Sequence, residues 1–215
     1  MTDIVFAKGT PDSVVDEVLG RMKTYKPYKR KKIYGVGIND ADYPTTHKLK
    51  NGKTWSCPLY SRWSDMLRRC YSPKSLANFA SYKGCYVDDQ WHSFMNFRKW
   101  MLNQDWDSGM FLDKDYLSGV VYGPDTCVLV PREVNNFLTD HASARGEWPI
   151  GVHFDKGQFV ATINDGSQRI YLGMYADPHT AHLAWKAAKC KLACQLADTK
   201  NVDDRVKHVL RTMFK

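Results

Sequence analysis

The chain has 215 residues, of which 43% are apolar and 13% aromatic, enough for one sizeable domain or two small ones. Its formal net charge of +8 favours a polyanionic partner. No apolar run is long enough to span a membrane and the N-terminus lacks a signal-peptide pattern, so we expect a cytoplasmic protein with no membrane partner.

The N-terminal part, residues 1–32, is expected to be a helix followed by a basic connector. Thr10, Pro11 and Asp12 are typical of a helix start. Between Arg21 and Lys53 there are ten Lys and Arg residues against two Asp, an excess equal to the net charge of the whole chain. The densest stretch is a candidate for phosphate binding, and a solvated linker without a partner is the alternative. Its residues are Lys29, Arg30, Lys31 and Lys32.

The central part, residues 33–140, is predicted to be an α+β domain. The segment 33–38 contains two glycines and is expected to be a strand or turn. Apolar residues at helical spacing predict aromatic-rich helices at 58–71 and about 89–103. Residues 111–138 then have the pattern of strand, loop, strand and helix. A polar stretch at 141–148 is the expected linker to the next domain.

The C-terminal part, residues 149–198, is predicted to be a three-stranded antiparallel sheet packed on one helix, with a further helix at 199–215. Apolar residues alternate in runs at 151–154, 158–164 and 169–175. Asn164-Asp165-Gly166 between the last two runs is a strong hairpin signal. Asp177-Pro178 begins the helix. Its expected apolar stripe comprises Ala181, Ala184, Trp185, Ala188, Leu192 and Leu196.

Alternation along the middle strand predicts which side chains face the helix. Phe159, Ala161 and Ile163 share one face, which the apolar stripe of the helix would cover. The opposite face then remains open to solvent or a ligand. It carries Gln158, Val160, Thr162 and Asn164.

This C-terminal module resembles the AP-two/ethylene-response-factor DNA-binding domain over about 48 residues. The resemblance rests on Gly151-Val152, the run 159–163, the run 169–175, Thr180-Ala181 and Ala184-Trp185. It implies that the open face of the sheet lies in the major groove of double-stranded DNA. The matching contact positions are His153, Thr162, Asn164, Arg169 and Tyr171, with Gln158 beside them on the same face. His153 and Asn164 stand where plant domains typically have arginine, so the preferred DNA sequence does not transfer.

The central part resembles the HNH homing endonucleases of phages and introns, which often end in such modules. The resemblance assigns Asp113 to the metal-ligand position, for Mg²⁺ or Mn²⁺, and Asn135 or Asn136 to the final position of the site. Lys114 occupies the place of the general-base histidine, and a protonated lysine cannot accept the water proton. A base from outside the motif, such as His92 or His141, is one alternative. Simple turn or capping roles for the aspartates are another.

We therefore expect an α+β protein with a degenerate HNH-like ββα domain and an AP-two-like domain. Three functions stay open on the sequence alone. The first is binding of double-stranded DNA with weak or no hydrolysis. The second is an active metal-dependent homing or nicking endonuclease, and the third is a phage protein that binds and inhibits a host protein. The six cysteines contain no Cys-x-x-Cys pair, so free thiols are expected, with a structural zinc as the alternative.

Overall fold

A computed structural model of the protein describes residues 4–22, 30–117, 119–137 and 147–214. The chain forms two compact units, Met1–Leu129 and Val130–Lys215. Helices and short strands occur in both, which confirms the expected α+β class. Within the described residues, no helix has the length and apolarity needed to cross a membrane. All six cysteines are free thiols, and four of them are buried.

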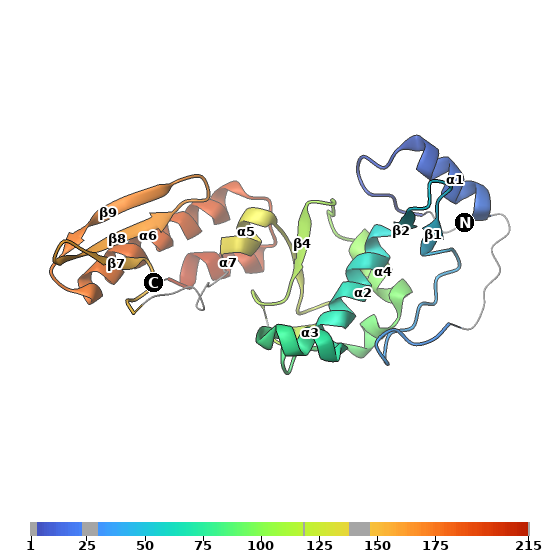
Figure 1. Cartoon of the computed structure of the whole chain (residues 1–215), viewed down its shortest axis with the longest axis horizontal. Helices are drawn as coiled ribbons and strands as arrows, with labels where there is room; N and C mark the ends of the chain where they lie inside the picture. The colour runs from blue at the N-terminus through green and yellow to red at the C-terminus, as the bar shows by residue number, and fades with distance from the viewer. Residues whose placement is uncertain (1–3, 23–29, 118, 138–146, 215) are drawn as a thin grey trace. The chain divides into compact units, whose positions relative to one another are not determined.

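Helices α1 (Asp12–Met22), α2 (Pro58–Tyr71), α3 (Pro73–Asn78) and α4 (Phe94–Leu102) belong to the first unit (Figure 1). The sequence predicted the bounds of α2 correctly. Pro58 is at its first position, where the missing N–H costs nothing, and five residues at helical spacing are buried. The Trp63 indole on α2 donates to the Trp91 carbonyl at 2.7 Å, so this fully buried ring also satisfies its polar atom.

The second predicted helix of this unit is interrupted, and the prediction of one continuous helix over 89–103 was wrong. A 3₁₀ turn, η2 (Asp89–His92), comes first, and α4 begins only after Ser93. Ser93 has extended backbone angles, and its Oγ accepts the Asn96 amide at 3.1 Å as an N-cap. The same hydroxyl donates to Asp40 at 2.6 Å. Local capping chemistry at Ser93 therefore overrides the apolar periodicity.

The strands that precede α5 form three small pairs. β1 (Thr46–Lys48) is antiparallel to β2 (Thr54–Ser56), and β3 (Tyr86–Val87) is parallel to β5 (Val121–Tyr122). β4 (Met110–Asp113) pairs with β6 (Val128–Pro131). The segment 33–38 is a tight turn, in which the Ile33 and Gly37 backbones bond each other at 2.8 and 2.9 Å.

The second unit contains α5 (Arg132–Phe137), β7 (Val152–Asp155), β8 (Gln158–Asn164), β9 (Arg169–Tyr175), α6 (Pro178–Thr199) and α7 (Asp204–Thr212). The division between the units therefore falls before α5, whereas the sequence suggested a linker at 141–148. Residues 138–146 lie outside the described residues. Lys189 on α6 holds α5 in this unit, because its ammonium donates to the Phe137 carbonyl at 2.9 Å and lies 3.6 Å from the ring centroid.

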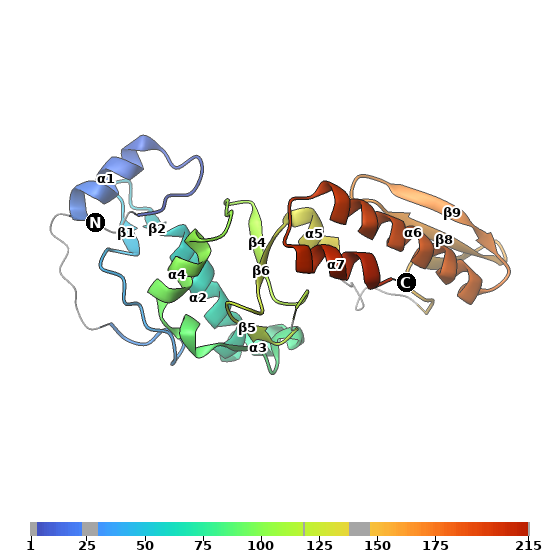
Figure 2. The ribbon, with the colours of Figure 1, turned by 180° about the vertical axis from the view of Figure 1, so that it is seen from behind.

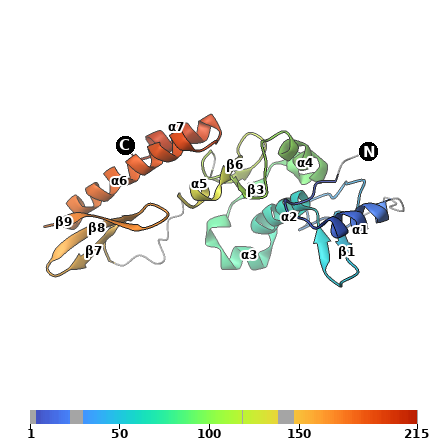
Figure 3. The ribbon, with the colours of Figure 1, turned by 90° about the horizontal axis from the view of Figure 1, so that it is seen from above.

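Helix α6 runs along one face of the three-stranded sheet, and α7 packs beside it (Figures 2 and 3). The predicted apolar stripe is correct in the first half of α6, where Ala181 and Trp185 are buried. In the second half the predicted Leu192 and Leu196 are half-buried, and the buried residues are their neighbours Ala193 and Ala197. The reason is α7, which packs against α6 through buried residues of its own.

Candidate nucleic-acid interface

The register of β7, β8 and β9 places the sequence-predicted contact residues on one face of the sheet. Residues paired directly across strands point to the same side. His153 pairs with Val160, Thr162 pairs with Tyr171, and Asn164 pairs with Arg169. Gln158 shares this side because it lies two residues before Val160 on the same strand. We call this side of the sheet the open face. Its residues are His153, Gln158, Val160, Thr162, Asn164, Arg169, Tyr171 and Met174.

The other face of the sheet packs on α6 and holds the open face in position. Ala161 is fully buried there, and Gly151 lies against Trp185. A Cβ on Gly151 would come within 1.9 Å of the Trp185 ring, so only glycine allows this approach. His182 on α6 stacks on Trp185 and bonds the Ile150 carbonyl at 3.0 Å, which fixes the start of β7 to the helix.

Exposure differs along the open face. Tyr171 is 60% exposed although it lies in a strand, and His153, Gln158, Asn164 and Arg169 are exposed as well. Among the described residues, none forms an ion pair or a side-chain hydrogen bond with the Arg169 guanidinium. A surface that presents a planar cation and an aromatic ring without internal partners is suited to an external ligand.

The hairpin turn at one end of the open face is fixed by two side chains. The Asp165 carboxylate accepts the amides of Ser167 and Gln168 at 2.8 and 2.9 Å. These hydrogen bonds, led by that of Gln168, lower the pKa of Asp165, so it remains ionised. Asn164 accepts the Gly166 amide at 2.8 Å, and part of its hydrogen-bonding capacity is therefore used within the turn.

Met174 also belongs to the open face, and the sequence pattern missed it. Strict alternation in β9 would place Gly173 beside Tyr171, but a register shift occurs between Ala161 and Thr162 of the partner strand. Gly173 then pairs with Ala161, and Met174 pairs with Val160. Gly173 could have indicated this bulge in the sequence, because a glycine inside a strand often marks one. In the structure its φ is +138°.

The basic connector is described only in part. Lys29 lies outside the described residues. Arg30 is half-buried and donates to both the carbonyl and the Oδ1 of Asn39, at 2.9 and 2.7 Å, so its guanidinium contributes to the fold. Lys31 and Lys32 are exposed and precede the Ile33 turn. Of the four predicted phosphate contacts, these two are the ones that the structure leaves on the surface.

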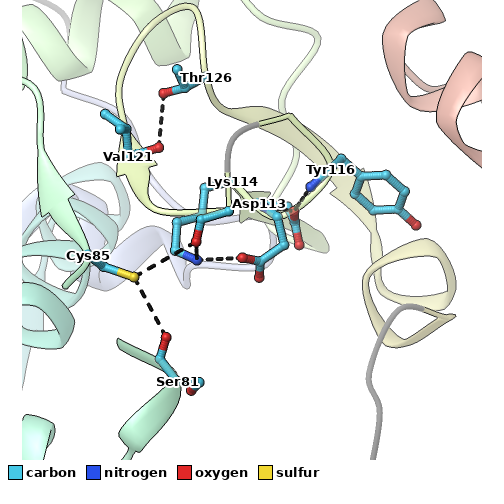
Figure 4. A network of polar contacts seen from close by, with 9 residues as sticks. Ser81, Cys85, Asp113, Lys114, Tyr116, Val121 and Thr126 are labelled. Atoms are coloured by element: carbon cyan, nitrogen blue, oxygen red, sulfur yellow. Dashed lines mark hydrogen bonds and ion pairs between the residues drawn. The ribbon is translucent and has the colours of Figure 1, made fainter. Parts of the chain in front are cut away.

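Asp113 and Lys114, the core of the HNH-like motif, are both buried (Figure 4). Asp113 Oδ1 accepts the amides of Asp115 and Tyr116 at 2.7 and 3.1 Å, which is the role of a turn-capping residue. Burial raises the pKa of this carboxyl group, and the two amides oppose that effect.

The Lys114 ammonium forms part of the same loop. It bonds the Asp115 carboxylate and donates to the Gly119 carbonyl at 2.7 Å, and it lies 5.5 Å from the Tyr122 ring centroid. Burial alone would lower its pKa, but the hydrogen bond and the charge of Asp115 prevail and raise it. A side chain that is 3% exposed and keeps its proton can neither accept a proton from water nor reach a phosphate.

Asn135 and Asn136, the candidates for the final HNH-like position, lie on α5, which directly follows β6. In the loop between β5 and β6, the Thr126 hydroxyl donates to the Val121 carbonyl at 2.9 Å. Within the described ranges, no group of three or more His, Cys, Asp or Glu side chains could hold a metal ion. Asp113, whose Oδ1 accepts two backbone amides, and the adjacent Lys114 cation therefore do not fit a bound Mg²⁺ or Mn²⁺.

Comparison with protein-family models, with curated proteins and with solved structures finds no match to this chain.

Proposed function

We propose that this protein binds double-stranded DNA and that the open face of β7–β9 contacts the bases in the major groove. The observation that carries the proposal is the exposed Arg169, Tyr171 and His153 on the sheet face opposite α6. A narrow antiparallel ribbon fits the major groove, which is about 12 Å wide. The resemblance to AP-two domains supports the same placement.

The side chains of the open face supply the chemistry that distinguishes base edges. Arg169 offers two parallel N–H donors to guanine O6 and N7. Gln158 offers the donor and acceptor pair that matches adenine. Met174, which is 42% exposed, adds an apolar contact beside them that suits the thymine methyl group, whereas its strand partner Val160 is buried. With one arginine on this face, base discrimination rests on a small number of contacts.

Phosphate binding, in this proposal, comes mainly from the N-terminal basic residues. The second unit contains twelve Lys and Arg against nine Asp and Glu, so its own charge is modest. The excess lies between Arg21 and Lys53, where Lys31 and Lys32 are exposed. Phosphate contacts hold the protein on the duplex, and base contacts select the sequence.

The proposal does not include hydrolysis. The position of the general base holds Lys114, which is charged, buried and bonded to Asp115 and Gly119. Asp113 in turn uses its Oδ1 to cap the adjacent turn. Both residues stabilise a loop, and neither is positioned to activate water or to stabilise a leaving group.

The salt dependence of duplex binding tests whether the N-terminal basic residues supply the phosphate contacts. We expect the logarithm of the association constant for a duplex to fall against the logarithm of salt with a slope of about −4 or steeper, as several lysine contacts with phosphates require. Replacing Lys31 and Lys32 together with glutamine should reduce the slope by about 2 for all DNA sequences.

Lys99→Gln is the matched control, because Lys99 is also exposed but lies on α4, outside the basic segment. It should leave the slope unchanged. A flat salt plot for the unmodified protein would remove the phosphate contribution from the proposal. No duplex binding at about 50 mM salt would instead favour a protein partner.

A further inference from the structure

Three aromatic residues lie close together in the sequence of the first unit, between α3 and β3. Phe79 ends α3, Tyr82 ends the 3₁₀ turn η1 (Ala80–Tyr82), and Tyr86 begins β3. We call these three residues the aromatic corner. Phe79 is 53% exposed and Tyr86 is 52% exposed, while Tyr82 is half-buried.

Local structure holds these rings on the surface. Ser72 caps α3 and accepts the Ser75 amide, and the Phe79 amide bonds the Ser75 carbonyl at 2.9 Å. The chain then enters η1 directly. The Tyr82 amide donates to the Phe79 carbonyl at 3.2 Å, and the two rings lie edge to face with centroids 6.4 Å apart.

Cations lie on both sides of Phe79 in the sequence. From Met66 to Val87 there are four Lys and Arg, of which Arg68 bonds Asp65, and Asp88 and Asp89 follow Tyr86. The Arg69 guanidinium lies over the Tyr82 ring at 5.6 Å from its centroid. Lys74 and Lys83 are exposed on either side of Phe79 in sequence. A polyanion therefore complements this surface better than an apolar or basic protein segment does.

We propose that the aromatic corner binds single-stranded nucleic acid by stacking unpaired bases on Phe79 and Tyr86 while the neighbouring cations bind the phosphates. Half-exposed rings combined with cations are the two components of sequence-tolerant single-strand binding. A duplex cannot use these rings in the same way, because its bases present only their edges. This site is independent of the open face, since it belongs to the other unit of the chain.

The experiment uses the full chain and labelled oligonucleotides of about 15 nucleotides at low salt. Deoxythymidine and uridine oligomers distinguish DNA from RNA, and an abasic strand of equal length measures the contribution of charge alone. We expect the base-containing strands to bind more tightly than the abasic strand. Phe79→Ala with Tyr86→Ala should weaken their binding by roughly 30-fold or more and leave the abasic strand unaffected.

Leu102→Ala is the matched control, because Leu102 is an exposed apolar residue of the same unit, on α4. It should leave oligonucleotide binding unchanged, and Arg169→Ala should do the same. Equal binding of abasic and base-containing strands would overturn the proposal. So would unchanged affinity of a double variant that unfolds at the same temperature as the parent protein. Duplex binding, measured in parallel, reports separately on the open face.

Discussion

Arg169→Ala should weaken binding to a preferred DNA duplex by roughly 5- to 150-fold, as expected for the loss of one bidentate base contact worth about 1–3 kcal/mol. The guanidinium is exposed on β9, opposite Asn164, and has no side-chain partner within the described residues. Truncation therefore removes a ligand contact without opening the core. Fluorescence anisotropy with a labelled duplex, selected from random sequence, measures the change.

Arg211→Ala is the control for this prediction. Arg211 belongs to the same unit but lies on α7, where it pairs with Asp198 at 2.5 Å on the surface. Such an exposed pair contributes little to stability because solvent screens it, and its loss should leave duplex affinity within about twofold of the parent value. Equal affinities for the Arg169 and Arg211 variants would count against the open face as the base-contacting surface.

Gly151→Ala should destabilise the second unit by about 2–4 kcal/mol. A Cβ there would overlap the Trp185 ring at 1.9 Å, and φ is +82°, where side chains are strained. Overpacking costs about 1–3 kcal/mol and the backbone strain about 1 kcal/mol more. Hydrogen exchange of peptides from β7 to β9 measures the loss in this unit alone, because the two units need not unfold together.

Gly157→Ala separates the two contributions. Gly157 has almost the same backbone angle, with φ +85°, but a Cβ there would meet nothing within 4 Å. Its cost should be about 1 kcal/mol, from backbone strain alone. If both alanine variants showed the same loss of protection, then the contact between β7 and Trp185 would not be what joins the sheet to α6.

Much of the second unit could be predicted because its signals are local. Asn164-Asp165-Gly166 encodes the hairpin, alternation encodes the strands, and Asp177-Pro178 encodes the helix start; the structure has all three. The bulge that brings Met174 to the open face was not predicted, because it depends on pairing between two strands rather than on either strand alone. The buried residues in the second half of α6, Ala193 and Ala197, were not predicted, because the sequence analysis did not consider packing of α7 against this helix.

The central part was predicted less well because its decisive contacts are between residues apart in the chain. In sequence, the resemblance places Asp113 and Lys114 at positions of a degenerate catalytic site, with a turn or capping role for the aspartates as the alternative. The burial of Asp113 and Lys114 depends on the Gly119 carbonyl and the Tyr122 ring, which the sequence does not place beside them. Similarly, the sequence analysis placed residues 132–137 in the central domain, whereas the bond between Lys189 and the Phe137 carbonyl connects α5 with α6.

Methylation protection of a selected duplex by the full chain tests most directly whether the open face binds in the major groove. Dimethyl sulfate modifies guanine N7 in the major groove and adenine N3 in the minor groove. We predict protection at guanine N7 within the bound site, at least one position of which is lost with Arg169→Ala. Protection confined to adenine N3, or the same guanine pattern for the parent protein and the variant, would contradict the proposed interface.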